Sequence, residues 1–99
     1  MSNIQITRHD TDTKGRYVAT IEGLEGEGEL TFSKASDTLI IVDHTSVPDS
    51  MRGMGVAGAF ARRVIEDARS AGQKIVPLCP FFSAYVARHK DKTADVING

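Results

Sequence analysis

The chain has 99 residues, which fits one domain with a single hydrophobic core. It is 40% hydrophobic and 25% charged, its formal net charge is −1, and its basic residues are scattered, so neither a nucleic acid nor a membrane surface is an expected partner. A single cysteine, Cys79, excludes an internal disulfide, and the sequence lacks an apolar run typical of a signal peptide or a membrane span, which together predict a cytoplasmic protein. His9, His44 and His89 lie far apart and at no recognised ligand spacing, so no metal site is predicted.

The first half of the sequence has the alternating pattern of β-strands. Four such runs are separated by short turn-forming segments, at residues 4–7, 16–21, 29–33 and 39–45. Short turns favour antiparallel pairing of consecutive strands. The last run begins with four apolar residues, Leu39–Val42, which predicts a strand that is covered on both faces. Alternation along it places His44 on the face of Ile40 and Val42, with Asp43 on the opposite face.

The second half changes to a helical period. Apolar residues recur every three to four positions between Gly55 and Ala71, and Gly72 is a typical residue for ending a helix. A short apolar strand at Ile75–Leu78 follows, and Pro80 suits the first turn of a second helix. Strand, helix, strand, helix in this order predicts a crossover between two parallel strands. The expected fold is therefore a single α/β domain over residues 1–99, with antiparallel strands followed by a β-α-β-α unit.

The stretch "RGMGVAG" at residues 52–58 can be interpreted in two ways. From Gly53 it has the G-x-G-x-x-G spacing of a dinucleotide-binding turn, and from Arg52 it has the R-x-x-G-x-A spacing of an acyl-CoA pyrophosphate loop. A dinucleotide fold needs the glycines directly after a strand and an acidic residue about 20 positions later. Neither condition is met, so the second interpretation is favoured, and dinucleotide binding remains a third possibility.

The run from Val47 to Ala57 resembles the central motif of the GNAT acetyltransferase superfamily, in which a strand end and a short loop precede R-x-x-G-x-A at a helix start. The resemblance implies that backbone N–H groups of the loop and first helical turn hold the pyrophosphate of acetyl-CoA. It assigns this role to Arg52, Gly53, Met54, Gly55, Val56 and Ala57. It also implies that the backbone of Thr45, Ser46 and Val47 pairs with the pantetheine arm, between two parallel strands that splay apart.

A second motif, "PLCPF" at residues 77–81 followed by Tyr85, resembles a subgroup of very short, single-domain GNAT-like proteins. This resemblance implies an acetyl-CoA-dependent N-acetyltransferase that acts on an amine of unknown identity. Exposed strand edges permit a dimer without requiring one, so a monomer or weak dimer is expected. The segments that commonly shape the acceptor site in larger members, the helices before the sheet and a C-terminal hairpin, have no counterpart in this sequence. A CoA-binding sensor or interaction module without transferase activity is therefore the alternative.

Cys79 should lie at the end of a strand and at the N-terminus of a helix, where the helix dipole favours a thiolate. This is also the edge at which α/β sheets bind ligands. Three roles are open: a nucleophile that carries the acetyl group, a residue that lines the thioester pocket, or a buried small hydrophobe.

Two further residues are candidates for proton transfer. Tyr85 matches the superfamily tyrosine that protonates the departing CoA thiolate, although a core aromatic would show the same pattern. Many superfamily members place a basic glutamate on the strand before the glycine loop. No glutamate occurs there, so the resemblance implies that His44 or Asp43 replaces it, and a hydrogen-bonded histidine at a sheet edge is the alternative.

Overall fold

The computed structural model describes residues 4–98, which form one five-stranded sheet with helices. The elements in chain order are β1 (Ile4–Asp10), β2 (Lys14–Ile21), β3 (Gly28–Ser36), β4 (Leu39–Ser46), the 3₁₀ turn η1 (Asp49–Met51), α1 (Val56–Ala71), β5 (Lys74–Pro77), α2 (Pro80–Arg88) and α3 (Lys90–Thr93). The mixed α/β class predicted from the sequence is confirmed. Strands β1 and β3 are longer than the alternating runs, because each continues into polar residues at a hairpin end.

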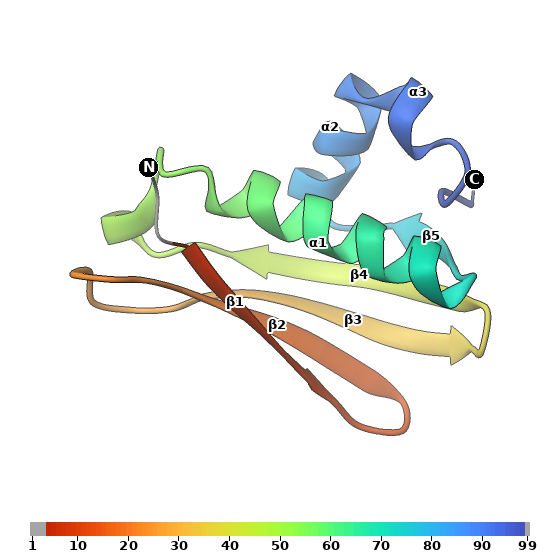
Figure 1. Cartoon of the computed structure of the whole chain (residues 1–99), viewed down its shortest axis with the longest axis horizontal. Helices are drawn as coiled ribbons and strands as arrows, with labels where there is room; N and C mark the ends of the chain where they lie inside the picture. Colours follow the sequence, from red (N-terminus) through yellow and green to blue (C-terminus); the bar gives the residue numbers. More distant parts are fainter. Residues whose placement is uncertain (1–3, 99) are drawn as a thin grey trace.

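The strands follow one another across the sheet in the order β1-β2-β3-β4-β5. The pairs from β1 to β4 are antiparallel, and β5 joins β4 in parallel after the crossover through α1. The predicted meander and crossover are therefore both confirmed (Figure 1).

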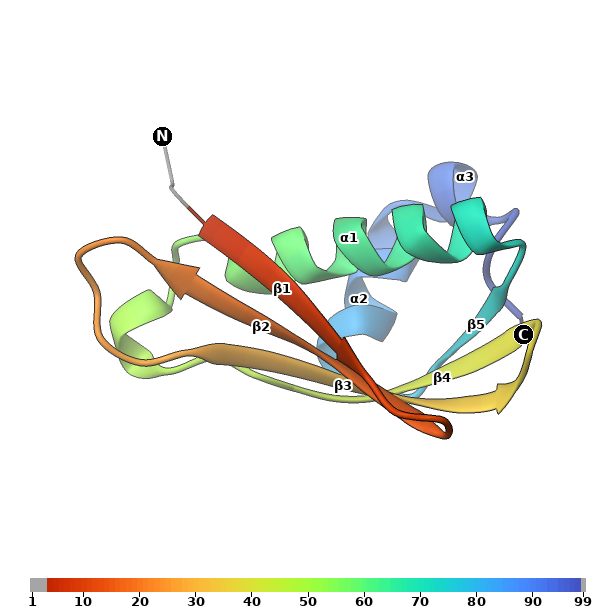
Figure 2. The same cartoon turned by 60° about the horizontal axis from the view of Figure 1, so that its bottom comes forward.

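All three α-helices lie on the same side of the sheet (Figures 1 and 2). Beneath them, Ile40 and Val42 of β4 are buried, whereas their neighbours Leu39 and Ile41 are partly exposed. The prediction that this strand is covered on both faces was wrong, because the apolar run does not reveal that, within residues 4–98, the helices all pack on one side of the sheet. The uncovered side of the sheet is called the open face below.

Helix α1 provides most of the helical contribution to the core. Its buried side chains recur at helical spacing and are Val56, Phe60, Ala61, Val64, Ile65 and Ala68. They pack against the inward face of the sheet, including Leu30 and Phe32 of β3. The helix ends at Gly72, as predicted, where φ is 70° and the backbone N–H bonds to the carbonyls of the last turn.

A polar network joins β1, β2 and β3 to the second half of α1. The Tyr17 hydroxyl donates to Asp67 Oδ2 at 2.7 Å, and Arg8 Nη1 lies 3.1 Å from that hydroxyl. Burial of the phenol, followed by its bond to the Asp67 carboxylate, raises the pKa of Tyr17. Arg8 also binds Asp10, which contacts Lys34 at 2.9 Å. The bond from Arg8 lowers the pKa of Asp10 to about 2.

The last described residues return to the edge of β5. Ile97 forms an isolated parallel bridge with Ile75, and Ile75 donates to the Val96 carbonyl at 2.7 Å. Within residues 4–98, no helix combines the length and apolar character that crossing a membrane requires.

Candidate active site

The parallel strands β4 and β5 separate partway along β4. Their pairing runs from Leu39–Lys74 to Val42–Pro77 and stops there. The Val42 carbonyl accepts from the backbone N–H groups of both Leu78 and Cys79, which turn the chain into α2. Strand β4 continues to Ser46 alongside β3 alone. The predicted splay between these strands is thus confirmed.

A β-bulge sits at the point of separation. Phe32 pairs with Val42 and Thr31 pairs with His44, so Asp43 is an extra residue on β4. The bulge reverses the alternation that follows it: Thr45 is buried, whereas Asp43 and His44 are both exposed. The sequence-based assignment of His44 to the face of Val42 was wrong for this reason, and no residue pattern in β4 marks the bulge.

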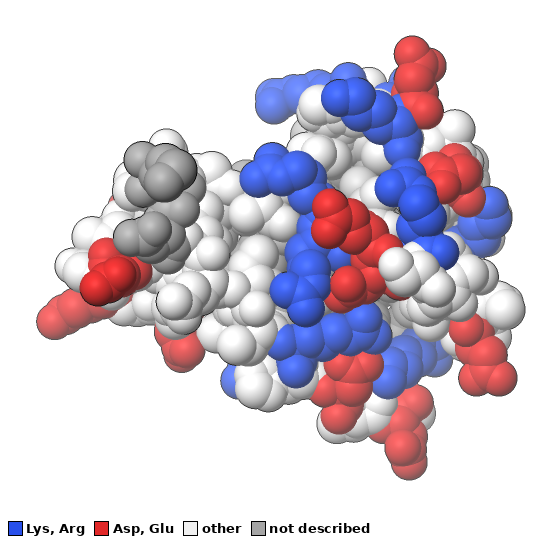
Figure 3. Space-filling model, viewed as in Figure 1, with Lys and Arg blue, Asp and Glu red and all other residues white. Residues whose placement is uncertain are grey.

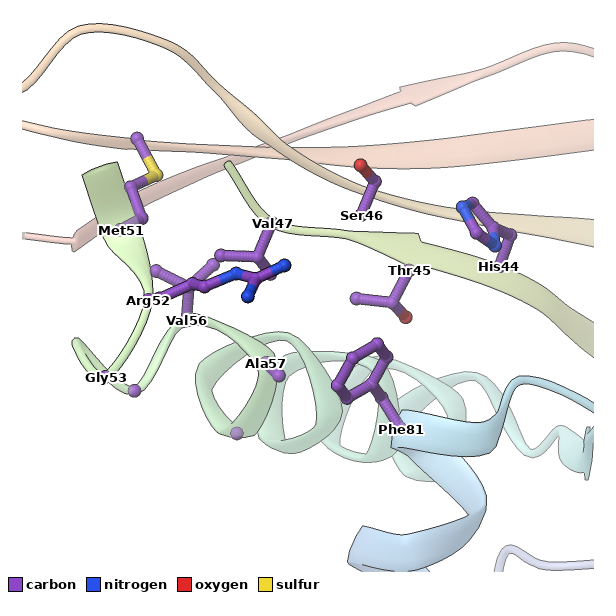
Figure 4. Close-up of a pocket in the computed structure, with 12 residues that line it drawn as sticks. His44, Thr45, Ser46, Val47, Met51, Arg52, Gly53, Val56, Ala57 and Phe81 are labelled. Atoms are coloured by element: carbon purple, nitrogen blue, oxygen red, sulfur yellow. The ribbon is translucent and has the colours of Figure 1, made fainter. Parts of the chain in front are cut away.

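A cavity of about 570 Å³ lies between the free part of β4 and the start of α1 (Figure 4). Most of the residues predicted to bind the cofactor line it: Thr45, Ser46, Val47, Arg52, Gly53, Gly55, Val56 and Ala57. The remaining lining residues are His44, Met51, Gly58 and Phe81. Met54, also predicted to bind the cofactor, is not among them. The cavity therefore brings together a strand and a loop that the sequence separates.

The glycine loop forms the end of this cavity at the start of α1. Gly53 and Gly55 have φ values of 77° and 82°, a conformation that side chains disfavour. A Cβ atom at either position would contact nothing within 4 Å, so the backbone is open to the cavity side. The first intrahelical bond runs from the Ala59 N–H to the Gly55 carbonyl. The N–H groups ahead of it lack helical acceptors, and no side chain caps them, which suits an anion.

Arg52 lies at the mouth of the loop. Its Nε is 3.0 Å from Asp49 Oδ1, and both side chains are mostly exposed. An ion pair this exposed contributes little to stability, so the arginine can exchange Asp49 for another anion at little cost.

Cys79 is the residue just before α2 and is fully buried, with 0% of its surface exposed. Its thiol donates a hydrogen bond to the Thr45 hydroxyl at 3.1 Å. This bond joins the two diverging strands just beyond the point at which their backbone pairing ends. Cys79 does not line the cavity surface, whereas its partner Thr45 does.

The two adjacent phenylalanines of α2 have different environments. Phe82 belongs to the core, whereas Phe81 is 59% exposed and faces Thr45 across the cavity (Figure 4). Both phenylalanines lie in the first turn of α2, so their sequence position does not distinguish the core residue from the exposed one.

Tyr85 is half-buried one turn further along α2 and packs against the core. Its ring stacks on that of His89 with centroids 4.3 Å apart. It does not line the cavity, so the structure leaves Tyr85 adjacent to the site through α2 rather than inside it. His44 lines the cavity but carries its ring on the open-face side of β4, as Ser46 does (Figure 4).

Charges around the molecule are mixed rather than segregated. Figure 3 shows basic and acidic side chains interleaved over the helices. Among residues 4–98, no group of three or more histidine, cysteine or carboxylate side chains is arranged to hold a metal ion. The cavity at the strand separation therefore offers backbone donors, the Thr45 side chain and the exposed arginine Arg52.

Comparison with known proteins defines the class to which this fold and cavity belong. Residues 16–96 match the sequence profile of the GCN5-related N-acetyl-transferase family, and the chain belongs to that family. The solution structure of a GCN5-like proposed N-acetyltransferase from Staphylococcus aureus is similar, with a TM-score of 0.67 and 28% identity over 100% of this chain and 92% of the other. A search of curated protein sequences finds no match to the chain. Family and fold are thus those of an N-acetyltransferase.

Proposed function

We propose that this protein is an acetyl-CoA-dependent N-acetyltransferase that transfers the acetyl group directly to an amine. The observation that carries the proposal is that one cavity is lined by both the free part of β4 and the glycine loop at the start of α1. A strand that has lost its partner on one side offers backbone donors and acceptors to an extended ligand, and the helix start offers donors to an anion.

The pyrophosphate of acetyl-CoA is proposed to bind at the loop from Gly53 to Ala57. Positive φ at two glycines and the absence of Cβ groups let phosphate oxygens approach the backbone closely. Arg52 adds one positive charge at the mouth. Met54 contributes its backbone position in the loop rather than its side chain, which is 40% exposed.

The pantetheine arm is proposed to run along Thr45, Ser46 and Val47. Beyond Val42 the edge of β4 that faces β5 has no ladder partner, so its peptide groups are available to pantetheine amides. This arrangement leads the thioester toward the point where the strands separate. There, Thr45 and Phe81 stand on opposite sides of the cavity (Figure 4).

In the proposed reaction, the amine nitrogen loses a proton and bonds to the acetyl carbonyl carbon, and the carbon–sulfur bond then breaks. His44 is the proposed acceptor of the amine proton, because it lines the cavity and its ring remains accessible to solvent. Tyr85 is the proposed donor to the departing thiolate. Tyr85 does not line the cavity, so its hydroxyl has to reach the sulfur from α2.

A covalent route through Cys79 is the less favoured alternative. The thiol is fully buried and donates a hydrogen bond to the Thr45 hydroxyl. A nucleophile must instead be a thiolate with access to the carbonyl. We propose instead that Cys79 supports the cavity by fixing the orientation of Thr45.

The proposal is tested by calorimetric binding of acetyl-CoA, followed by turnover with a panel of amines. Tyr85→Phe should bind acetyl-CoA normally and lose most of its turnover, about 10²-fold or more for a lost general acid. Tight acetyl-CoA binding without turnover of any amine would favour a CoA-binding module. Stabilisation by NAD with no response to CoA would restore the dinucleotide interpretation.

Intact-mass spectrometry after incubation with acetyl-CoA separates the two routes of transfer. Direct transfer predicts no acetyl adduct on the wild-type protein. An adduct that is present in the wild type and absent from Cys79→Ala would instead establish the covalent route.

A further inference from the structure

A second cavity, of about 390 Å³, lies on the open face of the sheet. Its polar lining residues include His9, Asp10, Lys14, Arg16, Thr31 and Asp43. Its volume is in the range of small-molecule sites. None of the proposed steps of acetyl transfer uses these residues, although Asp43 is adjacent to His44, the proposed acceptor of the amine proton.

The strand register relates this cavity to His44, which lines the candidate active site. His9, Arg16, Thr31 and His44 pair in turn across the four antiparallel strands, so they form one row. Their neighbours along the strands, Tyr17 and Phe32 among them, are buried beneath the helices. Alternation therefore directs the row away from the helices and onto the open face.

The bulge of β4 connects the two cavities. Asp43 lines the open-face cavity, and the next residue, His44, lines the cavity at the strand separation. Strand β5 has already left the sheet at this level, since its pairing ends at Val42. A molecule bound on the open face at Asp43 thus lies beside the gap through which the thioester would be reached.

Charge within the open-face cavity is divided between its two sides. Lys14 and Arg16 supply positive charge from β2, while the Asp43 carboxylate lies on β4 and accepts a hydrogen bond from Ser33 at 2.9 Å. The other carboxylate of the lining, Asp10, is already neutralised by its contacts with Arg8 and Lys34. Arg16 binds Glu29 through one nitrogen at 2.8 Å, which leaves further guanidinium donors for a second anion.

We propose that this open-face cavity is the acceptor site and that it binds a small zwitterionic amine. The ammonium group lies toward Asp43 and His44, and a carboxylate lies toward Arg16 and Lys14. Arg16 and His44 are two strands apart, roughly 10 Å along the sheet, so several carbon atoms separate the two charged groups of the ligand. This assignment of substrate class rests on the proposed acetyl transfer.

The test uses 6-aminohexanoate as the probe and, as the matched control, 6-aminohexanamide, in which an uncharged carboxamide replaces the carboxylate. Each is titrated into the isotope-labelled protein, without acetyl-CoA, while backbone amide shifts are recorded. We expect saturable shifts on β2, β3 and the β4 bulge with 6-aminohexanoate, and about tenfold weaker binding of the amide, because a charge-assisted contact is lost.

Two variants locate the carboxylate end. Arg16→Gln and Lys14→Gln should each weaken 6-aminohexanoate binding several-fold, up to about tenfold for the arginine. Lys92→Gln, a change of the same charge on α3 outside the cavity, should leave the affinity unchanged. Folding of each variant is confirmed by the dispersion of the same spectra.

Several outcomes would each overturn the proposal. The first are equal binding of the acid and the amide, and shifts confined to other surfaces. The others are no saturation up to about 10 mM, which corresponds to a binding free energy too weak for a site, and equal effects of Arg16→Gln and Lys92→Gln. Binding of acetyl-CoA is measured separately in the same samples. Loss of that binding contradicts the proposed function, whereas failure of the probe alone contradicts only the acceptor site.

Discussion

The two ends of the sheet are stabilised in different ways. Near the turns that join β1 to β2 and β3 to β4, charged and aromatic side chains form a continuous network in which Arg8 packs over the rings of Tyr17 and Phe32. At the opposite end, where β4 leaves β5, backbone pairing stops and a cavity opens. One side-chain hydrogen bond, from Cys79 to Thr45, spans that separation. The comparison teaches that the side-chain network is concentrated away from the cavity that we propose binds acetyl-CoA.

The largest expected effect is on ligand affinity at the open end. Gly55→Ala places a Cβ group in the loop that we propose binds the pyrophosphate and disturbs its positive φ, so we expect acetyl-CoA affinity to fall about 30-fold, the worth of one hydrogen bond to a charged group. Calorimetry measures this loss.

Gly72→Ala is the matched control for that change. Both glycines have positive φ and open space where an added Cβ group would lie, but Gly72 ends α1 far from the cavity. Each variant should lose about 1–2 kcal/mol of stability from backbone strain. Equal losses of acetyl-CoA affinity in the two would contradict the assignment of the loop.

At the network end, Asp67→Ala removes the acceptor shared by Tyr17, Arg8 and Arg63. We expect the free energy of unfolding to fall by about 1–2 kcal/mol, because hydrogen bonds from three side chains to a partly buried carboxylate are lost. Denaturant unfolding measures the change, and acetyl-CoA affinity should remain that of the wild type. A weaker affinity would show that the two ends are coupled.

The hydrogen bond from Cys79 to Thr45 is tested by Cys79→Ala, which leaves a small void and removes the donor to Thr45. The expected loss of stability is about 1 kcal/mol, and Cys79→Ser should lose less because its hydroxyl can replace the thiol as donor. Thermal unfolding compares the two. If serine is as destabilising as alanine, the hydrogen bond does not contribute and only packing matters.

The smallest expected effect is on how the free energy of unfolding depends on pH. The bond from Arg8 lowers the pKa of Asp10 to about 2, below that of an unfolded aspartate near 3.9. The contribution of this bond to the free energy of unfolding is therefore complete above about pH 4 and is lost as the pH falls toward 2. Because the side chain is partly exposed, the contribution should be under about 1 kcal/mol. Unfolding of Asp10→Asn should show a weaker dependence on pH in that window than the wild type does.

The sequence by itself was sufficient for the order of the strands and of α1 and α2, the meander, the crossover and the glycine loop, whereas η1 and α3 were not predicted. These features depend on local periodicity and on residues with special backbone preferences, such as Gly55, Gly72 and Pro80, and such signals are written within a few neighbouring positions. The residues that the sequence predicts to bind the cofactor on β4 and the loop line one cavity, except for Met54, and their role in binding stays a prediction.

Only the tertiary structure decided which faces of the sheet His44 and Thr45 occupy. The bulge at Asp43 depends on how β3 pairs with β4, and it moved His44 to the open face and buried Thr45. The bond between Cys79 and Thr45 joins residues 34 positions apart, and the open-face row joins four strands. Such contacts follow from register and packing across the whole sheet, which local patterns of apolar and polar residues do not encode.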